Sequence, residues 1–164
     1  MSGPSNESER TYSVLFVCLG NICRSPMAEA VFKKTVSNYD LRNNFECIES
    51  AGTAGYHVGD SPDPRTISVC KANDTPINSF AQQLQKSDFE KFDYIIGMDK
   101  SNVSNILRVK PKNSKSQVKL FGEFGDGKQI DDPYYGSDDG FERVYRQCEK
   151  YSKEFLINLG LIDS

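Results

Sequence analysis

The feature that most constrains the fold is the alternation of short apolar runs with longer segments of helical periodicity. Four short apolar or β-rich runs predict buried strands, at residues 13–17, 45–50, 94–98 and 118–121. Segments with helical patterns lie between and after them, at residues 26–36, 64–71, 101–108 and 139–159. Strands that alternate with helices favour right-handed crossovers and a parallel sheet. The pattern therefore predicts a single-domain, Rossmann-like α/β fold, with a four-stranded parallel sheet and helices on both faces.

The length and charge of the chain narrow its class. With 164 residues, it is long enough for one domain with a real core, which we expect over residues 12–164 after a flexible polar tail over residues 1–11. No segment approaches the roughly 20 apolar residues of a membrane span, and the polar start lacks the apolar region of a signal peptide. The net charge of −3 argues against a general nucleic-acid binder. We expect a cytoplasmic protein that binds neither membrane nor nucleic acid.

The cysteines indicate thiol chemistry in a reducing compartment rather than a disulfide framework. There are five of them, an odd number that cannot pair completely within one chain. Cys47, Cys70 and Cys148 are widely separated, and we expect each to be a small buried apolar residue. The chain has one histidine and no Cys-x-x-Cys pair, so a zinc site is not expected.

The segment that joins the first predicted strand to the first predicted helix carries the chemistry. It runs over residues 18–25, with the sequence CLGNICRS, and the helical pattern opens at Pro26. Gly20 and Asn21 tolerate left-handed backbone conformations, which let successive N–H groups turn inward as an anion nest. The following helix adds free N–H groups and the positive end of its dipole. We therefore predict that this loop binds a tetrahedral oxyanion.

Three side chains of the loop suggest what happens to that anion. Helix N-termini and cations favour the thiolate form of a cysteine, so Cys18 is expected to be a thiolate at neutral pH. Arg24 offers a planar fork that grips two phosphoryl oxygens, and Ser25 is placed to donate its hydroxyl to the Cys18 sulfur. The alternative is a structural junction with a buried cysteine and a surface arginine. A Walker-type nucleotide loop is excluded because no Gly-Lys-Ser/Thr follows.

The sequence VLFVCLGNICRSPMAEAVF, at residues 14–32, resembles the signature of the low-molecular-weight protein tyrosine phosphatases. SPDPR at residues 61–65 and DDPYYG at residues 131–136 match the same family, and weaker similarity covers residues 92–102 and the last helix. The resemblance implies a cysteine-dependent protein tyrosine phosphatase, or acid phosphatase. Such an enzyme hydrolyses phosphotyrosine and small aryl phosphates through a phosphocysteine and is inhibited by phosphate and vanadate. We expect a monomer or weak dimer without a cofactor.

A phosphate ester also needs an acid that protonates its leaving oxygen. The resemblance implies Asp132, although residue chemistry alone leaves Asp131 equal to it. Family members bind the phosphate with the loop residues Leu19, Gly20, Asn21, Ile22, Cys23 and Ser25, and the substrate ring with the aromatics at Tyr56, Tyr134 and Tyr135. His57 is then expected at the rim, without essential chemistry.

The resemblance further implies that Cys23 traps an oxidised Cys18 as a disulfide, and that Asp99 and Asn102 brace neighbouring loops. One departure stands out. Ser79 and Gln82 occupy positions where many members carry a histidine and an arginine, so weaker support of Ser25 is expected.

Two rival functions stay open. A thiol-dependent arsenate reductase shares this fold and loop, but it needs further cysteines as relays, and Cys70 is alone in its segment. A non-catalytic phosphotyrosine-binding protein would be expected to lack Cys18, Arg24 or Asp132, and all three are present.

Overall fold

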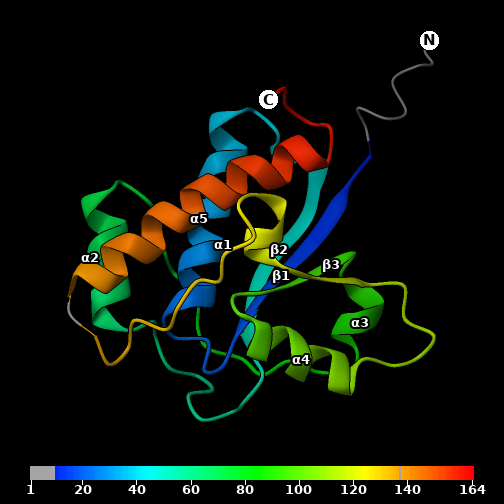
Figure 1. Cartoon of the computed structure of the whole chain (residues 1–164), viewed down its shortest axis with the longest axis horizontal. Helices are drawn as coiled ribbons and strands as arrows, with labels where there is room; N and C mark the ends of the chain where they lie inside the picture. Colours follow the sequence, from blue (N-terminus) through cyan, green and yellow to red (C-terminus); the bar gives the residue numbers. More distant parts are fainter. Residues whose placement is uncertain (1–9, 137) are drawn as a thin grey trace.

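A computed structural model describes residues 10–136 and 138–164. The described chain contains one parallel sheet in the order β2-β1-β3-β4 (Figure 1). Its strands are β1 (Tyr12–Cys18), β2 (Phe45–Gly52), β3 (Tyr94–Gly97) and β4 (Gln117–Leu120). The predicted four-stranded parallel sheet is confirmed. Most of the expected polar tail, residues 1–9, lies outside the described residues.

Helices cover both faces of this sheet, as predicted. They are α1 (Arg24–Asn38), α2 (Pro64–Ala72), α3 (Asp88–Lys91), α4 (Lys100–Val109) and α5 (Asp138–Asn158), with short 3-10 turns η2 (Arg42–Asn44) and η3 (Phe121–Phe124). Helices α1, α2 and α5 pack together on one face, and α3 and α4 lie on the other (Figure 1). In the described part of the chain, no helix is both long enough and apolar enough to cross a membrane.

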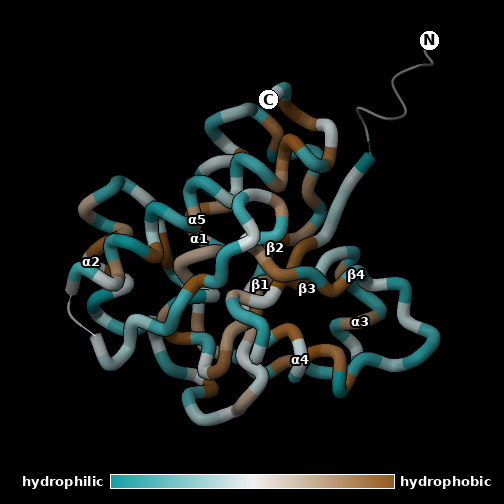
Figure 2. Tube along the Cα trace, in the orientation of Figure 1, coloured by the Kyte–Doolittle hydropathy of each residue, from teal (hydrophilic) through white to brown (hydrophobic). Residues whose placement is uncertain are grey.

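The central strand β1 divides the core between the two faces. Val14 and Phe16 belong to the cluster beneath α1 and α5, whereas Leu15 and Val17 belong to the cluster beneath α3 and α4. All four side chains are fully buried. A strand buried on both faces reads as a continuous apolar run rather than an alternating one, and Figure 2 shows that apolar character along the central strands.

Some local details differ from the sequence-based expectation. Helix α1 begins at Arg24 rather than at Pro26. The fourth strand ends at Leu120, because Phe121 turns into η3 and packs its buried ring against Phe16 and Tyr151. The short helix α3 was not predicted. Cys70 and Cys148 are buried as expected, but Cys47 is only half-buried, because it lies on the edge strand β2.

The strand order fixes where a ligand can bind. From β1 the chain passes to β2 on one side and later returns to β3 on the other side of β1. Ligands of open α/β sheets bind at such a switch point, beyond the carboxyl ends of the strands. Cys18 is the last residue of β1, so the predicted anion loop lies at this point.

Candidate active site

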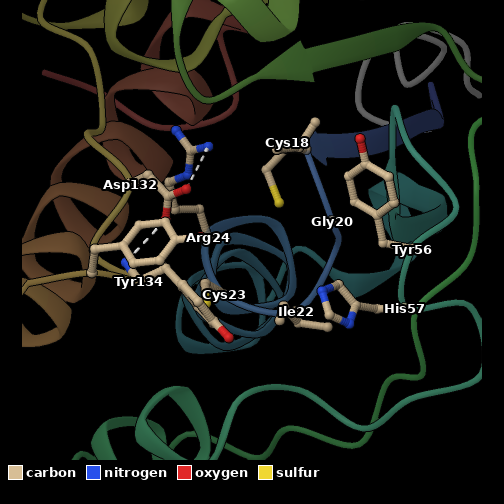
Figure 3. Close-up of a pocket in the computed structure, with 11 residues that line it drawn as sticks. Cys18, Gly20, Ile22, Cys23, Arg24, Tyr56, His57, Asp132 and Tyr134 are labelled. Atoms are coloured by element: carbon tan, nitrogen blue, oxygen red, sulfur yellow. Dashed lines mark hydrogen bonds and ion pairs between the residues drawn. The ribbon is translucent and has the colours of Figure 1, made fainter.

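A cavity of about 220 Å³ opens at the carboxyl end of β1 (Figure 3). Three segments far apart in the sequence line it: the loop after β1, the turn after β2, and the segment before α5. Its lining residues are Cys18, Leu19, Gly20, Ile22, Cys23, Arg24, Tyr56, His57, Asp132, Tyr134 and Tyr135. The fold therefore brings most of the predicted site residues together. Asn21 and Ser25 are the predicted site residues outside this lining, and both are buried.

The loop after β1 is held in shape by neighbouring backbone. The carbonyl groups of Cys18 and Leu19 accept the N–H groups of Thr53 and Ala54, at 2.9 and 3.0 Å. Asn21 has a left-handed φ of 57°, a conformation that asparagine adopts more readily than most residues. Of the two loop residues expected to allow a left-handed conformation, Asn21 adopts it and Gly20 does not.

Behind the loop, a chain of hydrogen bonds leads to the sulfur of Cys18. The Cys18 Sγ atom lies 3.1 Å from the Ser25 hydroxyl oxygen. That oxygen accepts a hydrogen bond from the Asn21 amide at 2.7 Å, and the Asn21 side-chain oxygen accepts the backbone N–H of Gln82 at 3.0 Å. The Ser25 hydroxyl can therefore donate its own proton either to the Cys18 sulfur or to the carbonyl of Ala51, which is more distant at 3.4 Å.

These hydrogen bonds show how Ser25 is supported although Ser79 and Gln82 depart from the family pattern. Gln82 supports Asn21 through its main chain, a contact that does not depend on the identity of the side chain. Its side chain instead donates to the carbonyl of Ser50 at 2.9 Å. Ser25 is thus anchored through Asn21 with serine and glutamine at positions 79 and 82. Weaker stabilisation of the thiolate stays a prediction.

Arg24 enters the cavity from the first turn of α1 and is almost fully buried. Its Nη1 atom donates to Asp99 at 2.7 Å and to the carbonyl of Ile130 at 2.9 Å, while Nη2 lies 3.9 Å from the Asp132 carboxylate. Burial opposes the charge, but the Cys18 sulfur and the carboxylates of Asp99 and Asp132 raise the pKa of Arg24 above its ordinary value. The guanidinium therefore stays charged and has a fixed orientation.

Asp99 also fixes the start of α4. Its carboxylate accepts the N–H of Asn102 at 2.7 Å, and the Asn102 side chain accepts the N–H of Asp99 at 3.2 Å. This capping box ties Arg24 to the first turn of a helix on the opposite face of the sheet.

The structure separates the two candidate acids. Asp132 lines the cavity, and its carboxylate accepts the N–H of Tyr134 at 3.0 Å. Asp131 is exposed and is not among the lining residues. A proton donor at Asp132 would thus face the same space as the Cys18 sulfur.

Aromatic rings form two walls of the cavity. In Figure 3, Tyr134 stands on the side of Asp132, and Tyr56 and His57 stand on the opposite side, with the Cys18 sulfur between them. The His57 Nδ1 atom lies 3.3 Å from the carboxylate of Asp60. An aryl group that enters between these walls would point its phosphate toward Cys18.

Arg65 was not predicted to contribute, yet it supports one of these walls. Its guanidinium lies 5.4 Å from the centre of the Tyr134 ring and 4.4 Å from that of Phe141. It also binds both carboxylate oxygens of Asp63 at 3.1 Å. The sequence contains no local signal for this contact, because Arg65 and Tyr134 are distant in the chain.

Cys23 lines the cavity close to this support. Burial, reinforced by the negative charge of Asp63, raises the pKa of Cys23 to about 12. Cys23 is therefore a neutral thiol at physiological pH. Among the described residues, no group of three or more His, Cys, Asp or Glu side chains is placed to hold a metal ion.

Comparisons with known proteins agree with this geometry. The family model described as "Low molecular weight phosphotyrosine protein phosphatase" matches residues 13–161. The curated protein of that name from Schizosaccharomyces pombe is 52% identical over 154 residues, which cover 92% of this chain and 99% of that protein.

Two solved structures share the fold. A protein tyrosine phosphatase from Entamoeba histolytica, solved with Hepes in the active site, superimposes with a TM-score of 0.86 at 38% identity, covering 92% of this chain and 97% of that one. A Drosophila arginine phosphatase gives a TM-score of 0.84 at 31% identity, covering 93% and 99%. Sequence and structure together establish that this chain belongs to the low molecular weight phosphotyrosine protein phosphatase family.

Proposed function

We propose that this protein hydrolyses phosphotyrosine in two steps through a phosphocysteine on Cys18. The observation that carries the proposal is the single cavity in which Cys18, Arg24 and Asp132 face one another between aromatic walls. A thiolate, a planar cation and a carboxylic acid supply the nucleophile, the phosphoryl grip and the proton that the reaction needs.

In the first step, the Cys18 thiolate attacks phosphorus and the bond from phosphorus to the aryl oxygen breaks. Asp132 gives its proton to the departing oxygen, and Arg24 holds two of the remaining phosphoryl oxygens. In the second step, water attacks phosphorus and passes a proton to Asp132, and the phosphorus–sulfur bond breaks. The Ser25 hydroxyl stabilises the returning thiolate, and inorganic phosphate leaves.

The walls of the cavity favour an aryl phosphate as the substrate. Tyr56, Tyr134 and Tyr135 present apolar ring faces, on which a phenyl ring stacks favourably. The resemblance to an arginine phosphatase makes phosphoarginine the second candidate. Arsenate reduction is not favoured, because Cys70 is fully buried in the cluster beneath α1 and α5 and does not line the cavity.

The proposal is tested by measuring hydrolysis of phosphotyrosine and phosphoarginine peptides, each with and without vanadate. We expect vanadate-sensitive release of phosphate, faster from phosphotyrosine, and competition by inorganic phosphate. Faster hydrolysis of phosphoarginine would overturn the substrate assignment. Thiol-dependent arsenate reduction without phosphatase activity would overturn the reaction. A monomer or weak dimer in the cytoplasm stays our expectation for the protein's state and location.

A further inference from the structure

A second depression lies directly beside the catalytic cavity. It has a volume of about 400 Å³ and lies between the last turns of α4, the turn after β2 and residues 83–86. Leu19 lines both hollows and is exposed. The depression, which we call the flanking cleft, thus adjoins the catalytic cavity at Leu19.

The charged side chains that line the flanking cleft are all positive. Lys86 and Arg108 line it, both are exposed, and its lining contains no Asp or Glu. Within the described residues, neither cation lies within 4.0 Å of a carboxylate, so neither forms an ion pair. The nearby carboxylate of Asp88 accepts the backbone N–H of Gln85 at 2.8 Å rather than pairing with either cation. The two cations therefore remain available to a ligand.

The opposite rim of the catalytic cavity is acidic. Asp132 lines it and exposed Asp131 precedes it, whereas Asp60 lies at the other wall, where its carboxylate is 3.3 Å from the His57 Nδ1 atom. The chain as a whole is also acidic, with a net charge of −3. A negatively charged polypeptide at the mouth is repelled from one rim and attracted to the other, because opposite charges across an interface steer and orient binding.

We infer that the flanking cleft binds acidic residues that neighbour the phosphotyrosine of a protein substrate. Lys86 and Arg108 would pair with Asp or Glu side chains, and apolar Leu19, Leu84 and Val109 would contact the aliphatic parts of the peptide. The inference rests on the proposed function, since it assigns a substrate class to the same site.

The experiment compares three phosphotyrosine peptides of equal length whose flanking residues are acidic, neutral or basic. Hydrolysis of free phosphotyrosine, measured in parallel, tests the proposed function without any flanking residue. The quantity that tests the cleft is the ratio of kcat/KM for the acidic peptide to that for the neutral peptide. General damage to the enzyme cancels from this ratio.

We expect the acidic peptide to be preferred about tenfold at low salt, since an exposed ion pair contributes a factor of about two to five. In the double variant Lys86→Gln/Arg108→Gln the ratio should fall close to one. In the matched control Lys71→Gln it should stay high, because Lys71 lies in α2, on the opposite face of the sheet from α4 (Figure 1). Added salt should lower the ratio for the parent and leave the double variant unchanged.

Equal kcat/KM values for the three peptides would overturn the inference while leaving the proposed function intact. The same would follow if Lys71→Gln lowered the ratio as much as the double variant. Absence of hydrolysis of free phosphotyrosine and of every peptide would instead overturn the proposed function, and the inference with it.

Discussion

The guanidinium of Arg24 is anchored to Asp99 through Nη1 at 2.7 Å, while its Nη2 atom lies only 3.9 Å from Asp132. One terminal nitrogen thus fixes the side chain and the other faces the space in which a phosphoryl group would react. Because the Asp99 carboxylate also caps α4, the position of Arg24 depends on the packing of both layers of the fold.

We predict that Arg24→Lys lowers kcat about 10² to 10³-fold, the usual cost of losing one preorganised donor to a reacting oxyanion. A single ammonium cannot satisfy Asp99, the carbonyl of Ile130 and two phosphoryl oxygens at once. Steady-state kinetics with phosphotyrosine measure the effect, with Arg146→Lys, at an exposed position of α5, as the control. A loss below tenfold would mean that Arg24 does not grip the transferring group.

The contacts of Arg24 show what the sequence can and cannot predict. The loop at residues 18–25 is local, so its strand, left-handed residue and helix were predictable from adjacent residues. The partners of Arg24, Asp99 and the carbonyl of Ile130, follow it by 75 and 106 residues. Their approach depends on how β3 and the segment before α5 pack beside β1.

The difference between local signals and tertiary contacts also explains which other predictions the sequence allowed. The central strand β1 was predictable because a strand buried on both faces reads as a continuous apolar run, as its residues 14–17 do. Residue chemistry alone could not separate Asp131 from Asp132, since the choice depends on which carboxylate faces the cavity. The support of Tyr134 by Arg65 was missed because it is a tertiary contact without a local pattern.

Oxidation should give a reversible disulfide between Cys18 and Cys23. Peroxide converts the Cys18 thiolate to a sulfenic acid, and the Cys23 sulfur then displaces water as the new S–S bond forms. In Cys23→Ser, most of the activity lost to peroxide should not return with a thiol reductant, whereas Cys47→Ser should recover like the parent. Full recovery of Cys23→Ser, or peptide mapping that joins Cys18 to Cys70, would contradict this account.

Buried thiols should make the fold sensitive to alkali. Burial raises the pKa of Cys70 from its ordinary value of 9.0 to about 12, so the folded protein keeps a proton that the unfolded chain loses. The resulting stability is fully present below pH 9 and is lost as the pH rises from 9 to about 12, with a slope of up to about 1.4 kcal/mol per pH unit for each such thiol.

Urea unfolding between pH 8 and pH 10 measures this loss. The free energy of unfolding should fall more steeply above pH 9 in the parent than in Cys70→Ala, whatever the stability of that variant at pH 8. Parallel curves for the two proteins would exclude a contribution from Cys70.

Asp132→Asn should slow cleavage of phosphotyrosine about 10² to 10⁴-fold, because an ordinary phenolate leaves badly without a proton. Nitrophenyl phosphate, whose leaving group needs less help, should be less affected in the first step. Asp131→Asn is the matched control and should behave like the parent with both substrates. If Asp131→Asn showed the leaving-group-dependent loss instead, the acid would be Asp131.

The covalent intermediate is the central claim, and trapping it tests that claim most directly. In Asp132→Asn, water attack lacks its base, so nitrophenyl phosphate should give a burst of nitrophenol and accumulate phosphoenzyme. Acid quench, digestion and mass spectrometry should then place the phosphate on Cys18, with no phosphoenzyme and no turnover in Cys18→Ser. Phosphate on any other residue, or turnover by Cys18→Ser at even a few per cent of the parent rate, would contradict the account.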